Sequence, residues 1–134
     1  MCYIICVVVI VNSLVLAYLG DAVYELWIRE YLINKGFVKV NDLQNESMKY
    51  VSAKSQVHHL HRLLDKNIFT ENEIDIIKRG RNSSSHGKKN VDIITYKKST
   101  GLECLIGYLK INNNIDRINE IMNYIVRDND ESNG

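Results

Sequence analysis

Two carboxylates in this 134-residue chain have surroundings that point to chemistry. Asp21 interrupts a strongly apolar helical run, where burying an unpaired carboxylate would be costly. Glu25 follows one helical turn later, so two acids share a face, a pattern that favours a bound divalent cation. The alternative is a salt bridge from Asp21 to Arg29, Arg79 or Arg81. The helical pattern alone favours neither interpretation.

Glu103 is the second candidate acid. It stands three residues after Thr100, the spacing of a capping box in which a threonine hydroxyl and a glutamate close the first turn of a helix. By this pattern alone, a structural role for Glu103 is slightly favoured over a catalytic one.

A local positive patch accompanies these acids. Residues 80–90 (GRNSSSHGKKN) are predicted to form a loop, whose glycines and serines would let a phosphate backbone approach. The loop has no aromatic residue to stack on unpaired bases, which favours a duplex over a single strand. A solvated surface loop is the alternative. The candidate nucleic-acid-binding residues are Lys54, Lys78, Arg79, Arg81, Asn82, Lys88, Lys89 and Lys97.

Other potential metal ligands fit a metal site less well. On a helix, His58 and His61 share a side while His59 points away, and no cysteine or acid is spaced to join them. We therefore expect these histidines to lie at the surface or to face nucleic acid. The three cysteines, an odd number without CxxC spacing, argue against a disulfide framework and a zinc site.

The elements that position these residues are predicted to be helices. The chain has no proline, and its apolar residues recur at helical spacing. We expect an all-α protein whose first helix, apolar on nearly every side, is central. Capping boxes at Thr70 and Thr100 should begin the third and fourth helices, and Gly80 should end the third. The other predicted helices cover residues 14 to about 32, 41 to about 64, and about 115–127.

Length and composition indicate one domain with one core. The formal net charge is only +1, so a nucleic-acid partner would have to be recognised through local charge. We expect the domain to span residues 13–127 and residues 128–134 to be a disordered tail.

Residues 1–12 are a short apolar extension. They cannot cross a bilayer without joining the next helix, and Asn12, Ser13 and Asp21 interrupt that union. The segment also lacks the basic start and cleavage site of a secretory signal. We expect it to pack on the domain or on a partner; alternatively, translation begins near Val11.

Four segments together resemble the ribonuclease III family. They are LAYLGDAVYE (residues 16–25), YVSAKSQ (50–56), RGRN (79–82) and STGLECLIGYL (99–109). In this order, in a chain that ends soon after the last helix, they resemble the family's compact bacterial branch, the Mini-III ribonucleases, which lack a double-stranded-RNA-binding domain. The resemblance covers residues 13–127, and the four segments taken jointly are highly specific.

The resemblance implies an all-α, ribonuclease III catalytic-domain-like helical bundle that dimerises and cuts double-stranded RNA with Mg²⁺, for which Mn²⁺ can substitute. The family's two signature acids match Asp21 and Glu103, the implied catalytic and metal-binding residues, with Glu25 and Thr100 beside them in supporting roles. Larger family members carry two further acids where this chain has Ala17 and Thr100, a departure that the compact branch shares. Carboxylates suit Mg²⁺ better than cysteines or histidines do.

The resemblance also implies a substrate and partners. We expect a homodimer whose surface draws on Val23, Tyr24 and Trp27. The natural substrate would be a stem in precursor 23S ribosomal RNA, cut in the cytoplasm, with the large ribosomal subunit precursor as a partner and without stable membrane association. The main alternative is a non-catalytic double-stranded-RNA-binding or ribosome-assembly module of the same fold. A helical protein–protein module and a DNA-binding regulator rank below it.

Overall fold

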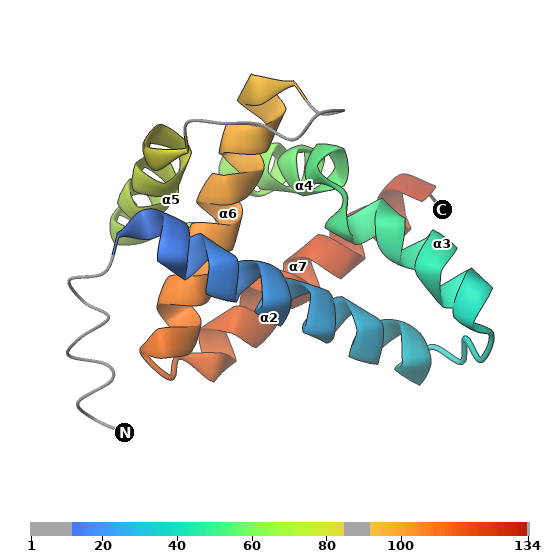
Figure 1. Ribbon diagram of the computed structural model, residues 1–134. Helices are drawn as coiled ribbons and strands as arrows, with labels where there is room; N and C mark the ends of the chain where they lie inside the picture. The colour runs from blue at the N-terminus through green and yellow to red at the C-terminus, as the bar shows by residue number, and fades with distance from the viewer. Residues whose placement is uncertain (1–11, 85–91, 134) are drawn as a thin grey trace.

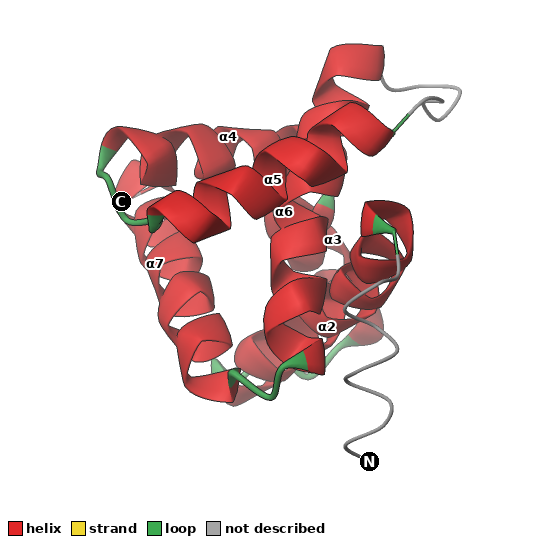
Figure 2. Ribbon diagram, turned by 90° about the vertical axis from the view of Figure 1, so that its left-hand side faces the viewer, coloured by secondary structure: helices red, strands yellow, loops and turns green. Residues whose placement is uncertain are grey.

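The computed structural model describes residues 12–84 and 92–133. Within these ranges the chain forms six helices and no strand, which confirms the all-α prediction (Figures 1 and 2). None of the described helices is both long enough and apolar enough to cross a bilayer. The helices are α2 (Ser13–Asn34), α3 (Val40–Val51), α4 (Ala53–Asp65), α5 (Glu71–Ser83), α6 (Ile93–Ile111) and α7 (Ile115–Asn133).

Helix α6 is the centre of the domain. Nearly every side chain from Ser99 to Leu109 is buried, and α2, α4, α5 and α7 all pack against this helix. Figure 1 shows α2 crossing in front of α6. The prediction that the first helix would be central was wrong, because one face of α2 is exposed, with Tyr18 84% and Leu26 58% accessible.

Helices α2 and α6 approach each other backbone to backbone. A Cβ atom on Gly20 would lie 1.7 Å from the carbonyl oxygen of Glu103, and a Cβ atom on Gly107 would lie 1.8 Å from that of Leu16. No side chain larger than a hydrogen atom fits at either position. The two glycines therefore fix how closely the helices cross.

Of the three helix boundaries predicted from Thr70, Gly80 and Thr100, the structure has only the first. The Thr70–Glu73 capping box does begin α5. However, α6 begins at Ile93, where the Asp92 side chain accepts from the backbone N–H of Thr95 (2.9 Å), so Thr100 lies inside the helix. Likewise α5 continues beyond Gly80 to Ser83. Gly80 does not end the helix but lets α5 pack closely on α6, since a Cβ atom there would lie 2.6 Å from the Cβ of Cys104.

The second predicted helix is broken at Ser52. Its side chain accepts from the backbone N–H of Ser55 (3.2 Å) and caps α4, so the carbonyls of Lys49, Tyr50 and Val51 lose their helical partners, while that of Met48 still accepts from the backbone N–H of Ser52 (3.4 Å). Side chains meet all of the last four carbonyls of α3. Ser55 Oγ donates to Met48 (3.2 Å), Tyr24 Oη to Tyr50 (2.9 Å), Gln56 Nε2 to Val51 (3.1 Å), and His59 Nε2 lies 3.4 Å from the oxygen of Lys49.

The expected disordered tail is wrong for its described part, since α7 continues to Asn133. Asp128 is 1% accessible and accepts from Arg62, and its Oδ2 lies 3.1 Å from His59 Nδ1. Two residues later, Asp130 accepts from the Tyr31 hydroxyl (3.0 Å) and lies 3.6 Å from Lys35 Nζ. These long-range partners hold the end of α7 against the domain.

The glycine crossing leads to a prediction about stability. Gly20→Ala should lower the free energy of unfolding by about 2–3 kcal/mol, because the new methyl group must push α2 and α6 apart. Gly36→Ala is the matched control. Gly36 has a φ of 105° but open space around it, so this substitution strains the backbone without a clash and should cost about 1 kcal/mol. Urea unfolding measures both; equal losses would contradict the crossing.

The Asp128 ion pairs predict a pH dependence. Burial acts to raise the pKa of the Asp128 carboxyl, but hydrogen bonds from His59 and Arg62 outweigh burial and hold the pKa below its usual value. A lowered folded pKa stabilises the protein above the unfolded pKa of about 4, and this contribution is lost as the pH falls through the folded value.

Asp128→Asn should therefore cost about 2 kcal/mol at neutral pH and flatten the loss of stability below about pH 4. The comparison is the free energy of unfolding across pH, with the exposed Glu131→Gln on the same helix as control. If the free energy of unfolding of Asp128→Asn falls below pH 4 as steeply as that of the wild type, Asp128 is not the cause of the loss of stability in acid.

Candidate active site

Asp21 and Glu103 line one cavity of about 350 Å³. Asp21 comes from α2 and Glu103 from α6, while the α3–α4 break supplies Val51, Ala53 and Gln56 to the same cavity. Two carboxylates far apart in the sequence are thus brought to one concave place. This arrangement is what a site for a divalent cation requires.

The glycine crossing explains how the two acids meet. Gly20 immediately precedes Asp21, and the position of its missing Cβ points at the carbonyl group of Glu103 itself. One helical turn before each acid, Ala17 and Thr100 line the same cavity. The positions at which larger family members carry two further acids therefore belong to this site.

Asp21 is exposed, so the expectation that its helix would bury it was wrong. Within residues 12–84 and 92–133 it forms no ion pair. The alternative of a salt bridge from Asp21 to Arg29, Arg79 or Arg81 is therefore not found there. Glu25 instead pairs with Arg29 (2.9 Å) and does not line the cavity. Glu25 therefore does not join Asp21 in the cavity.

Glu103 is half-buried and lies in the middle of α6, so its predicted role in a capping box was wrong. Thr100 does not cap a helix either; its hydroxyl donates to the carbonyl of Tyr96 (2.9 Å). Gln56 Nε2 lies 3.5 Å from Glu103 Oε2 and donates to it. Sequence analysis assigned no role to Gln56, although the residue ends the YVSAKSQ segment.

The buried phenol of Tyr24 lies close enough to Glu103 to feel its charge. Burial raises the pKa of its phenol well above the usual value, and the nearby charge of Glu103 raises it further. The phenol therefore keeps its proton and remains a donor to the carbonyl of Tyr50 (2.9 Å). The α3–α4 break is thereby tied to α2 beside the cavity.

The described candidate RNA-binding residues fall into two groups, one beside the cavity and one at the end of α5. Lys54 and Lys97 each follow a residue that lines it, Ala53 and Tyr96. Lys78, Arg79, Arg81 and Asn82 are exposed at the end of α5, which packs against α6. None of the five basic residues pairs with an acid of the described chain. Lys88 and Lys89 lie outside the described residues.

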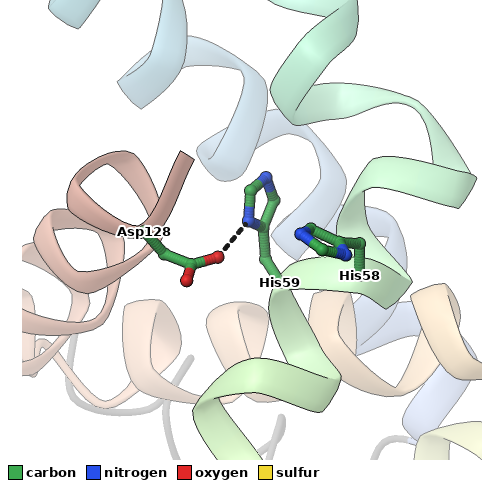
Figure 3. A group of neighbouring side chains, drawn as sticks. All are labelled: His58, His59 and Asp128. Carbon is green, nitrogen blue, oxygen red and sulfur yellow. Dashed lines mark hydrogen bonds and ion pairs between the residues drawn. The ribbon is translucent and has the colours of Figure 1, made fainter. Parts of the chain in front are cut away.

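His59 is buried, which corrects the expectation of a surface histidine. Figure 3 shows its ring directed at Asp128, with His58 beside it, and candidate ligand atoms of the three residues lie within 4.8 Å of one another. However, Asp128 already accepts from Arg62, and Lys66 Nζ lies 3.9 Å away. The positive charges of Arg62 and Lys66 beside Asp128 would repel a metal ion. The three residues therefore belong to an ion-pair network and do not form a metal site.

Comparisons with known proteins agree with this geometry. A sequence profile of the Ribonuclease III domain matches residues 14–114. A Mini-ribonuclease 3 from Streptococcus pneumoniae is 44% identical over 88% of this chain and 93% of its own. A Mini-ribonuclease 3 from Staphylococcus aureus is 45% identical over 87% of this chain and 88% of its own.

A solved structure shares the fold. The crystal structure of a protein from Fusobacterium nucleatum superimposes with a TM-score of 0.77 at 30% identity, covering 87% of this chain and 93% of that one. The matched profile includes both cavity acids, Asp21 and Glu103. The chain therefore belongs to the ribonuclease III family of endoribonucleases, within its Mini-ribonuclease 3 group.

Proposed function

We propose that this endoribonuclease hydrolyses phosphodiester bonds of double-stranded RNA in the cavity lined by Asp21 and Glu103, with Mg²⁺ as its cofactor. The observation that carries the proposal is the convergence of these two acids from α2 and α6 in one cavity. Family membership supplies the reaction class, and the cavity supplies a place for it.

The residues present fit a hard divalent cation. Asp21 and Glu103 offer carboxylate oxygens, and no lysine, arginine, histidine or cysteine lines the cavity among the described residues. When bound, such a cation supplies charge neutralisation at the phosphate and a more acidic water. The same donor set suits Mn²⁺, which we expect to substitute.

The chain's own residues divide the remaining work. Glu103 accepts a hydrogen bond from Gln56 in the cavity, while Asp21, which also lines it, is exposed. The hydroxyl of Thr100 is directed to a backbone carbonyl, and Ala17 offers no polar group, so these two shape the cavity without adding charge. Among the described residues that line the cavity, two carboxylates would then face the phosphate, which limits repulsion of the substrate.

The unpaired basic residues around the cavity suit a duplex. Lys54, Lys78, Arg79, Arg81 and Lys97 would contact phosphates on both sides of the acids, and Asn82 would hydrogen-bond to the backbone. Contacts of this kind read shape more than base sequence and weaken steeply as salt rises.

The exposed face of α2 supports a homodimer. Val15, Tyr18, Ala22, Leu26 and Ile33 follow one another at helical spacing and are exposed. The residues named from the sequence contribute less, since Tyr24 is buried in the domain and Trp27 donates to Asn119 (2.9 Å). Tyr18 also lines the cavity, so a partner on this face would stand at the rim of the site.

We further propose that the natural substrate is a stem of precursor 23S ribosomal RNA, cut in the cytoplasm during maturation of the large ribosomal subunit. The family resemblance supports this assignment. The small size of the domain and its own basic rim fit a substrate that is presented as a ready-formed helix.

The catalytic proposal predicts the effect of two isosteric substitutions. Asp21→Asn and Glu103→Gln should each lower the rate of duplex cleavage by on the order of 100-fold or more, because each removes a charged oxygen that would hold the cation. Cleavage of a labelled RNA duplex with Mg²⁺ or EDTA measures the rates, single strands serving as a negative substrate. Glu30→Gln, an exposed acid on α2, is the control. A wild type that binds the duplex but never cuts it would favour the RNA-binding alternative.

The dimer proposal predicts a different pattern. Leu26→Lys places a charge in the middle of the exposed α2 face and should raise the dimer dissociation constant by about tenfold or more. Val38→Lys is the control, since Val38 is 86% exposed but lies beyond the end of α2. Sedimentation equilibrium measures both. Equal dissociation constants for the two variants would place the dimer surface elsewhere.

A further inference from the structure

Gln56 is a buried amide that joins two features of the fold. It is 2% accessible, and its Nε2 donates both to the carbonyl of Val51 (3.1 Å) and to Glu103 Oε2 (3.5 Å). These two acceptors fix the orientation of the amide, because a carboxylate and a carbonyl can only receive hydrogen bonds. One nitrogen thus links the α3–α4 break to the acid in the cavity.

Three further donors meet carbonyls at the break. Ser55, Tyr24 and His59 each hold one carbonyl of the last turn of α3. His59 is in turn held by Asp128 of α7. The break is therefore a fixed frame, and Gln56 is the member of this set that also donates to the catalytic acid.

The opposite end of the same amide indicates why glutamine stands here. Gln56 Oε1 is buried and accepts no hydrogen bond from the described residues. A buried acceptor without a donor destabilises the fold and offsets the stability that the hydrogen bond to Val51 contributes, so stability alone gives glutamine little advantage over an apolar side chain of similar length. What the amide adds is an N–H donor that reaches Glu103 as well as Val51.

We propose that Gln56 is the positioning residue of the site, which holds the Glu103 carboxylate in the orientation that binds the divalent cation. The inference rests on the proposed function, since it assigns Gln56 a task toward the same cation. A donor to one carboxylate oxygen restricts rotation of the side chain. Loss of the donor leaves the acid in place but removes one restraint on its orientation.

Binding of Mn²⁺ to the apo protein tests this without any cleavage assay. Gln56→Met keeps the length of the side chain and removes the donor. We expect its Mn²⁺ dissociation constant, measured by electron paramagnetic resonance, to rise by about 10- to 100-fold. Its unfolding temperature should stay within a few degrees of the wild type, because the unsatisfied oxygen is lost together with the hydrogen bond to Val51.

Two controls separate positioning from general loosening. Ser55→Ala removes a different side chain from the break, and Gln44→Met makes the same chemical change on α3, in a residue that lines another cavity. Both should bind Mn²⁺ as the wild type does. Weaker binding by Ser55→Ala to the same degree as Gln56→Met would overturn the inference in favour of a merely structural role.

The remaining outcomes distinguish this inference from the proposed function. Unchanged Mn²⁺ binding in Gln56→Met, together with its loss in Glu103→Gln, would overturn the role of Gln56 and leave the metal site intact. A wild type that binds no Mn²⁺, or a Glu103→Gln variant that binds it normally, would overturn the metal site and this inference with it.

Discussion

The close crossing of α2 and α6 is the constraint on which the site depends. Gly20 and Gly107 let each helix reach the carbonyl groups of the other, and the buried side chains of α6 exclude water around the contact. Because the approach is between backbones, it leaves little freedom for the helices to slide or rotate. Asp21 and Glu103 lie at this crossing. Their separation is therefore set by the rigid part of the fold and does not rely on a loop.

The break between α3 and α4 has the complementary role. A continuous helix would satisfy its own carbonyls and leave Gln56, Tyr24 and His59 without these acceptors. By ending α3 at Val51, the chain frees the carbonyls of Lys49, Tyr50 and Val51, which receive donors from α2 and α4. Through His59 and Asp128 the same frame is tied to the end of α7. The last turns of the chain thus support the wall of a cavity that they do not line.

The helices could be predicted because apolar periodicity is a local signal, but their ends could not always be. Thr70–Glu73 and Thr100–Glu103 have the same capping pattern; the first begins a helix, and the second lies inside one that Asp92 had already begun. Glycine was equally ambiguous, since Gly80 marks a close contact with α6 and no end of α5. The buried His59–Asp128 pair joins residues far apart in sequence, and no local pattern announces such a partner. That Asp21 and Glu103 belong to one site was predicted from the family's motifs. The contact of Gln56 with Glu103 could be recognised only in the folded structure.

Asp21 was singled out for a reason that the structure does not bear out. An acid in an apolar helix need not be buried, because α2 is buried along one stripe only and presents Asp21 to solvent. Exposure suits the proposed chemistry, since a hydrated carboxylate needs no basic partner that would compete with a cation. Glu103 is held by a donor, whereas Asp21 can adjust its side chain. In the proposed site, one restrained and one adaptable carboxylate would allow a cation to bind between two helices whose backbones cannot move to meet it.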